Sequence, residues 1–153
     1  MTEVLRIGPD DWETFRDVRL RALADSPDAF ASTLERERAF AEADWRRRVS
    51  GPVVVVLDPD PVSVGGLFAD DGISHVWGMW TDPAHRRRGH ARAILDRLIP
   101  PDGPVELHVN VANQGARTTY ERYGFVGTGV FEALRPGSDQ RIELMVLLRT
   151  PRG

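Results

Sequence analysis

Residues 79–95 read MWTDPAHRRRGHARAIL, and this stretch decides how the rest of the chain is interpreted. Its apolar start is typical of a strand, the Asp-Pro pair ends that strand, and an amphipathic helix is predicted from Gly89 to Ile99. A helix N-terminus exposes unpaired N–H groups at the positive end of its dipole, and the small residues Gly89 and Ala91 leave room beside them. The stretch therefore predicts a turn that binds phosphate through its backbone.

The residues of this turn exclude two common phosphate-binding motifs. No Gly-Lys-Ser/Thr sequence follows, so the turn is not a Walker loop, and with a single Gly it is not a dinucleotide-binding loop. Positive charge is nevertheless concentrated here, on Arg86, Arg87, Arg88 and Arg92. We therefore expect a phosphate-containing ligand of another type.

Hydrophobic periodicity on both sides of the turn predicts a mixed α/β chain in which residues 1–153 form a single domain. Pro and Gly fall between periodic segments and form no linker, which favours one compact unit. The expected strands are residues 3–7, 53–57, 62–69, 73–81, 105–109, 126–131 and 141–148, and the expected helices lie near 12–23, 41–49, 89–99 and 116–123.

Composition excludes several classes of function. The chain has 153 residues and no Cys, which rules out a disulfide framework, a Cys nucleophile and a thiolate zinc site, and we predict no metal site. The formal net charge of -3 argues against binding nucleic acid through bulk charge, although all 20 basic residues are Arg. The sequence shows neither a membrane-spanning apolar run nor a signal peptide, so we expect a soluble, cytoplasmic protein without a membrane partner.

Two motifs, in this order, resemble those of the GNAT acetyltransferases. Residues 86–91, RRRGHA, fit the pyrophosphate loop R/Q-x-x-G-x-G/A of that family, and Thr81-Asp82-Pro83 stands where the family has V-x-P. The family pattern N-x-x-A-x-x-x-Y-x-x-x-G-F follows the next strand. In this chain that pattern is formed by Asn113, Ala116, Tyr120, Gly124 and Phe125.

The element order matches the same family from Glu3 to Leu148. The resemblance implies a GNAT acyl-CoA N-acyltransferase fold, with a twisted mixed sheet of about six or seven strands flanked by three or four helices. It also implies that acetyl-CoA lies in a gap where strands 73–81 and 105–109 splay apart. The cofactor-binding residues carried over by position are Met79, Trp80, Thr81, Arg86, Arg87, Arg88, Gly89, His90, Ala91, Arg92, Asn113 and Tyr120.

The resemblance assigns catalytic roles as well. Tyr120 would lie near the sulfur and protonate the departing thiolate, while a backbone N–H of residues 79–81 would polarise the thioester carbonyl. Relatives often use a Glu base, and one of its positions is His108 here, so His108 is the second catalytic candidate. A structural role for His108 remains open, as do Glu106 or a water chain as the base, with His75 a weaker candidate. By strand alternation, His75 and Trp77 share a face with Met79 and Thr81, and they could line the acceptor groove.

The resulting hypothesis is an acetyl-CoA-dependent N-acetyltransferase that acts on a primary amine of a small molecule or peptide by direct attack on the thioester. In this fold the acceptor is chosen by residues 25–40 and 131–140, where Glu35, Glu37 and Asp139 would favour a cationic amine. Alternatives are a ribosomal-protein-type N-terminal acetyltransferase and a non-catalytic acyl-CoA-binding module. A homodimer through an exposed edge strand at 141–148 is also possible.

Overall fold

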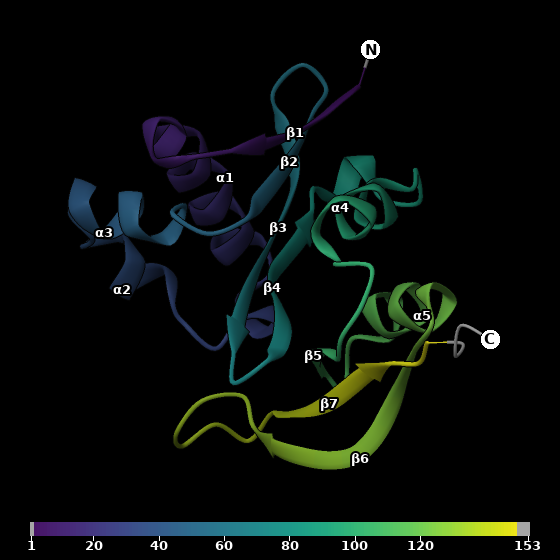
Figure 1. Cartoon of the computed structure of the whole chain (residues 1–153). Coiled ribbons are helices and arrows are strands. Elements are labelled where there is room, and N and C mark those ends of the chain that lie inside the picture. Colours follow the sequence, from purple (N-terminus) through teal and green to yellow (C-terminus); the bar gives the residue numbers. More distant parts are fainter. Residues whose placement is uncertain (1, 150–153) are drawn as a thin grey trace.

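A computed structural model describes residues 2–149, which form one seven-stranded sheet in the order β1-β2-β3-β4-β5-β7-β6 (Figure 1). The expected mixed α/β fold is confirmed. The strands are β1 (Glu3–Ile7), β2 (Val53–Leu57), β3 (Pro61–Asp70), β4 (Ile73–Thr81), β5 (Val105–Asn110), β6 (Phe125–Ala133) and β7 (Arg141–Leu147). The α-helices are α1 (Trp12–Asp25), α2 (Leu34–Arg38), α3 (Glu42–Arg48), α4 (His90–Leu98) and α5 (Gln114–Tyr123), and the short 3-10 helices are η1 (Pro9–Asp11), η2 (Pro27–Ala29) and η3 (Pro83–His85).

The helices cover both faces of the sheet, so there are two apolar cores (Figure 1). One face of β2–β4 packs against α1 and α3, where Phe15 and Trp45 are buried. The other face packs against α4 and α5, where Leu95 and Tyr120 meet side chains of β5 and β7. We call these the α1 face and the α4 face. Alternate residues of β2 enter opposite cores, which explains why its continuous run of valines is apolar throughout.

The strands β4 and β5 form the one parallel pair among the strand pairs of residues 2–149, and this pair is short. Their ladder consists of Ser74 opposite Val105 and His75 opposite Glu106. Beyond those residues β4 pairs only with β3 and β5 only with β7 within the described chain, so the two strands diverge toward their carboxyl ends. The predicted gap between these strands is therefore present.

A β-bulge in β4 shapes this gap. Gly78 has φ 66°, and the register with β3 shifts between Val64 and Gly66. Trp77 consequently packs on the α1 face, whereas Met79 packs in the core of the α4 face. The expectation that Trp77 and Met79 share one face is wrong, because the extra residue of the bulge breaks the period of two.

Two further differences from the sequence-based interpretation concern the ends of the sheet and the helices. The strand β7 lies between β5 and β6, so residues 141–148 do not form an edge; β6 is the edge strand on that side. After β6 the chain turns back, and β7 is inserted between β6 and β5. The pattern of apolar residues in a strand does not reveal this order. Within residues 2–149, α2 is the one α-helix that the sequence did not predict. Its N-cap residue is Thr33, whose side-chain oxygen accepts a hydrogen bond from the backbone N–H of Arg36. No helix within that range is long and apolar enough to span a bilayer.

Candidate active site

The loop between β4 and α4 has the conformation of an anion-binding turn. Arg87 and Gly89 have φ values of 65° and 81°, and Gly89 is the N-cap of α4. No side chain caps this helix start, and a Cβ on Gly89 would meet no atom within 4 Å. The first N–H groups of α4 therefore face open space, which is the arrangement that favours a bound phosphate.

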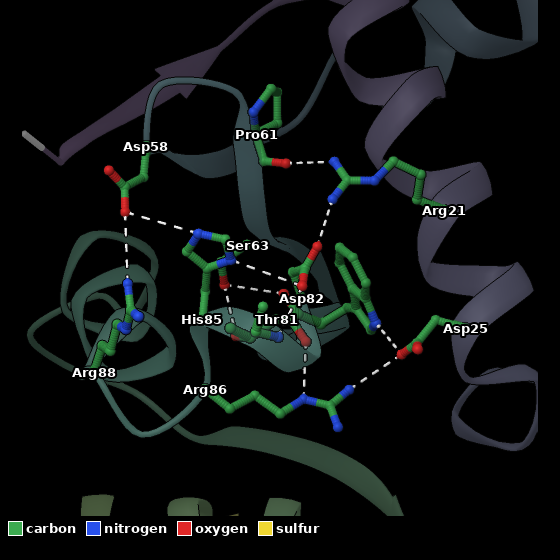
Figure 2. A network of polar contacts seen from close by, with 12 residues as sticks. Arg21, Asp25, Asp58, Pro61, Ser63, Thr81, Asp82, His85, Arg86 and Arg88 are labelled. Carbon is green, nitrogen blue, oxygen red and sulfur yellow. Dashed lines mark hydrogen bonds and ion pairs between the residues drawn. The ribbon is translucent and has the colours of Figure 1, made fainter.

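A polar network fixes the end of β4 and the start of this loop (Figure 2). The guanidinium of Arg86 donates to the carbonyl of Thr81 at 2.9 Å and to Asp25 at 3.2 Å, so it joins the loop to the end of α1. Arg21 of α1 donates to Asp82 at 2.7 Å and to the carbonyl of Pro61 at 2.6 Å. Arg86 is one of the predicted cofactor ligands, but its guanidinium forms hydrogen bonds that hold the loop in place.

Two carboxylates of this network, Asp25 and Asp82, have lowered pKa values. Burial opposes ionisation of Asp25, but hydrogen bonds from Ser26 and Trp80, together with the charge of Arg86, outweigh it and lower the pKa of Asp25. The backbone N–H of Ala84 is the main cause of the lowered pKa of Asp82, with Arg21 adding to it. Stability from these groups is present above their unfolded-state pKa values and is lost as the pH falls through the folded-state values.

The other basic residues of the loop are held less tightly. Arg88 lies 3.8 Å from Asp58 in an exposed ion pair, and the guanidinium of Arg92 lies 5.8 Å from the ring centroid of Tyr123. Burial is the main cause of the lowered pKa of His90, so this first helical residue of α4 is neutral at neutral pH. The loop therefore combines backbone donors with the positive charges of Arg88 and Arg92.

At the opposite side of the gap, β5 leads into α5 through the residues of the second motif. Asn113 is the N-cap of α5 and accepts a hydrogen bond from the N–H of Ala116 at 3.1 Å. This capping role explains the Asn at the start of the motif, since Asn is favoured at N-caps. The side-chain oxygen is used by the helix, so the amide nitrogen is the group that Asn113 could offer to a ligand.

Tyr120 lies on the buried side of α5. It is 8% exposed and contacts Phe125 edge-on, with ring centroids 6.1 Å apart. Burial raises the pKa of Tyr120 to about 12, so its hydroxyl keeps its proton at neutral pH. The neighbouring Tyr123 differs, because its hydroxyl donates to Asp96 at 3.0 Å.

The predicted base candidates lie on the α1 face of β4 and β5, in two histidine–glutamate pairs. His75 lies 3.0 Å from Glu106 at the closed end of the gap, and each side chain is 20% exposed. His108 lies farther along β5, 3.5 Å from Glu132 of the edge strand, and is 40% exposed. The sequence did not indicate either partnership, because each one joins two strands that are separated along the chain by a helix, α4 for His75 with Glu106 and α5 for His108 with Glu132.

A pocket of about 340 Å³ adjoins the wide end of the gap, between η2 and the turn that follows β5. Asn110 closes one side of it, donating to the carbonyl of Asp28 at 2.8 Å and to Gln140 at 2.7 Å. Arg135 donates to the carbonyls of Phe30 and Pro27, so the two segments expected to choose the acceptor are in contact. Asn110 thus has a structural role in joining the turn after β5 to these segments.

One part of the predicted acceptor chemistry is wrong. Glu37 is fully buried and accepts two hydrogen bonds from Arg19, each at 3.0 Å, and one from Arg48 at 3.1 Å. Burial opposes its ionisation, but the hydrogen bonds and charge of Arg19 outweigh burial and lower the pKa of Glu37. Glu37 therefore cannot bind a cationic amine. The sequence signal that could have pointed to Arg19 is its place in the apolar stripe of α1, beside Val18 and Ala22.

Comparison with known proteins gives the family. The model of the acetyltransferase (GNAT) family matches residues 12–125, which span both motifs. The chain belongs to the GNAT family of acetyltransferases. It is 31% identical over 136 residues to the mycothiol acetyltransferase of Brachybacterium faecium, a match that covers 78% of this chain and 39% of that protein. The chain thus spans less than half the length of this relative.

Solved GNAT structures have the same fold. The putative acetyltransferase yncA from Salmonella typhimurium, solved with its cofactor acetyl-CoA, aligns with a TM-score of 0.74 and 14% identity, covering 100% of this chain and 96% of that one. The ribosomal-protein-S18-alanine N-acetyltransferase from Escherichia coli aligns with a TM-score of 0.72 and 16% identity, covering 100% and 97%. These values establish the fold, and the first of these two neighbours was solved with acetyl-CoA.

The geometry of this GNAT chain fits that cosubstrate. The open helix start of α4 suits a pyrophosphate, and the diverging strands leave the backbone of β4 beyond His75 without a partner from β5 among the described residues. An extended pantetheine arm can form hydrogen bonds with the backbone of such an unpaired strand, as an added peptide strand does.

Proposed function

We propose that this protein transfers the acetyl group of acetyl-CoA to a primary amine of a small molecule or peptide. The observation that carries the proposal is the combination of an uncapped, Gly89-started helix with strands that separate after His75. The first feature suits the pyrophosphate of the cosubstrate and the second suits its pantetheine arm. Together they would direct the thioester toward the bulge at Gly78.

The cofactor contacts follow from this placement. Backbone amides of residues 87–92 would hold the pyrophosphate, with Arg87, Arg88 and Arg92 adding charge, and Arg86 would act by fixing the loop. The backbone of Met79, Trp80 and Thr81 would border the pantetheine arm, and Asn113 would donate to it from the facing strand end. An N–H beside the bulge would polarise the thioester carbonyl.

The transfer is a direct attack. The neutral acceptor amine forms a bond to the acetyl carbon, the bond from that carbon to sulfur breaks, and the thiolate of coenzyme A leaves. Tyr120 donates its proton to that sulfur, because burial keeps its hydroxyl protonated, and it recovers a proton from solvent. The proton lost by the amine goes to a base on the α1 face.

His108 is the base that we propose, acting directly or through water. It lies on the same face of β5 as Glu106, and its Nε2 lies 3.5 Å from a carboxylate oxygen of Glu132. The pair of His75 and Glu106 lies at the closed end of the gap and is the second candidate. Replacing His108 with Gln should lower turnover least at low pH, because a protonated imidazole cannot act as a base, and more as the pH rises toward neutrality. Replacing His75 with Gln would have this effect if the other pair is the base.

A second candidate function is acetylation of a protein N-terminus. It is favoured by the spacing of His108, Asn113 and Tyr120, which resembles the Glu-Asn-Tyr arrangement of ribosomal-protein acetyltransferases. A peptide acceptor would enter between η2 and the β6–β7 connection, where the pocket of about 340 Å³ lies. The proposed function does not depend on which of these two acceptor classes is used.

The deciding experiment is thiol release from acetyl-CoA in the presence of amines, amino acids and peptides. Turnover with any acceptor supports the proposal, and its absence with all of them would favour a non-catalytic acyl-CoA-binding module.

A thermal-shift series tests the cosubstrate site separately, since a ligand of the native state raises the melting temperature. CoA and desulfo-CoA should stabilise the fold, whereas pantetheine alone should do so much less. Equal stabilisation by pantetheine would contradict the phosphate site.

A further inference from the structure

A buried cation on α1 has a free hydrogen-bond donor. Arg19 is 5% exposed, and its Nε and Nη2 atoms each donate to Glu37 at 3.0 Å. Its Nη1 atom is also buried but has no hydrogen-bond partner within residues 2–149. Buried polar groups are nearly always paired in native proteins, so an unpaired guanidinium nitrogen points to a partner that the chain itself does not supply.

The free nitrogen lies beside the bulge of β4. A Cβ on Gly78 would be only 3.4 Å from Nη1 of Arg19, so the absence of a side chain at this glycine lets the guanidinium approach the bulge closely. The guanidinium carbon lies 4.6 Å from the ring centroid of Phe30 and 6.0 Å from that of Trp77. These two rings and the carboxylate of Glu37 fix the direction of the donor toward the point where β4 has left β5.

The local charges are not balanced. Arg19 and Arg48 share the single carboxylate of Glu37, with Arg48 at 3.1 Å, so the cluster carries an excess positive charge in a largely buried place. Each of these charges would be stabilised by a further anion, and burial makes such an interaction stronger than it is in water. An anionic group within hydrogen-bond distance of Nη1 would supply both the missing acceptor and the missing charge.

Charges of the opposite sign lie across the gap. On the α1 face of β5, Glu106 contacts His75, and His108 is near Glu132 of β6. The β4 side of the acceptor site therefore offers a cation, and the β5 side offers carboxylates with histidines. A molecule that bears an anion and an amine close together matches this pattern in one orientation, with its amine toward the proposed base.

Resting on the proposed acetyl transfer, we propose that Arg19 Nη1 binds a carboxylate of the acceptor, so the acceptors are amines that carry a carboxylate near the amine, as amino acids do. The carboxylate would accept a hydrogen bond from Nη1 beside Gly78, and the amine would face the thioester carbonyl. Simple amines and polyamines lack the anion and would leave Nη1 unpaired. Charge-assisted hydrogen bonds to guanidinium are among the strongest in proteins, so the selectivity should be large.

The test compares acceptors that differ only in the anion. For each of several amino acids, kcat/KM is measured with the free acid and with its primary amide, at saturating acetyl-CoA, and each rate is divided by the fraction of acceptor present as free amine. We expect the acid to be preferred about 10- to 100-fold. Equal values for acid and amide in the wild-type protein would overturn the proposal while leaving acetyl transfer intact.

Two matched variants locate the effect. Arg19→Lys keeps a cation beside Glu37 but removes the free nitrogen at Gly78, so the preference for the acid should fall to within about threefold. Arg48→Lys makes the same chemical change on the other partner of Glu37 and should retain the wild-type preference. A preference that survives in folded Arg19→Lys would overturn the assignment to Arg19, and melting curves establish that both variants fold.

Binding separates this proposal from the proposed function. If no amine is acetylated, acids and amides are titrated calorimetrically into the protein saturated with CoA. Tighter binding of the acids, lost in Arg19→Lys, would support the carboxylate site although acetyl transfer had failed. Equal dissociation constants for acids and amides would overturn the carboxylate site as well.

Discussion

Replacing Tyr120 with Phe separates the chemical role of its hydroxyl from its packing role. The ring is 8% exposed and contacts Phe125, and Phe keeps both the ring and its buried area. At neutral pH the free energy of unfolding should therefore change by less than about 1 kcal/mol. CoA affinity should change little, since most of the proposed cofactor contacts are made by the α4 loop, the backbone of β4 and Asn113.

Turnover should fall because the variant has no proton to give to the departing sulfur. General acid catalysis is typically worth about 10²- to 10⁴-fold, but a thiolate is a fairly good leaving group, with a pKa near the Cys value of about 8.5. We expect kcat to fall about 10- to 100-fold.

The same substitution has a second consequence at alkaline pH. Burial raises the pKa of Tyr120 to about 12, against a reference value of 10.0, so the folded state holds the proton more tightly than the unfolded state does. The stability that follows from this is complete below pH 10 and is lost as the pH rises toward 12. The rise in the pKa from 10.0 to about 12 corresponds to about 2 to 3 kcal/mol of unfolding free energy. Tyr120→Phe should lack this part of the decrease in stability at alkaline pH.

Tyr123→Phe is the matched control. Tyr123 lies on the same helix, its pKa is also raised to about 12 by burial and by Asp96, and its hydroxyl is bonded to Asp96. Tyr123→Phe should also reduce the decrease in unfolding free energy at alkaline pH, but it should keep the wild-type kcat. Denaturant unfolding at pH 7 and pH 11, together with steady-state kinetics, gives both readouts. Wild-type turnover in folded Tyr120→Phe across the pH range would refute its role as the acid.

Three further results are expected. Gly89→Val places a branched residue at φ 81°, so it should lower the free energy of unfolding by about 1 to 2 kcal/mol and weaken CoA binding at least about tenfold. The control Gly103→Val, at φ 91° and with equally open space, should lose the same stability but bind CoA normally in titration calorimetry. Asp82→Asn should lower stability at neutral pH and flatten the loss of stability below the reference pKa of 3.8, because the folded-state pKa is depressed; an unchanged acid unfolding curve would contradict this. If the protein dimerises through its edge, light scattering should show Phe131→Glu, on β6, to be monomeric, and a wild-type monomer at every concentration would exclude that dimer.

Much of the fold and part of the site could be predicted from the sequence, because they depend on local order along the chain. The turn at residues 86–91 and the capping residue Asn113 are set by the φ values that Gly permits and by the hydrogen bonds that Asn makes with its own helix start. The strands and helices follow from apolar periods, which bring alternate residues of β2 and a stripe of α1 into the cores. These are short-range properties, so the amino-acid sequence by itself determined the family motifs, the strands and helices of the mixed fold and the turn at residues 86–91.

The remaining features were decided by the tertiary structure. The bulge at Gly78 depends on how β3 and β4 are registered, and it moved Met79 to the other face. Arg19 and Glu37 meet across 18 positions of the sequence, and which acid neutralises a buried arginine depends on where α2 packs. The edge of the sheet is β6 because β7 pairs with β5. Contacts between distant segments have no periodic signature, so the free donor of Arg19 beside the gap is visible only once the chain has folded.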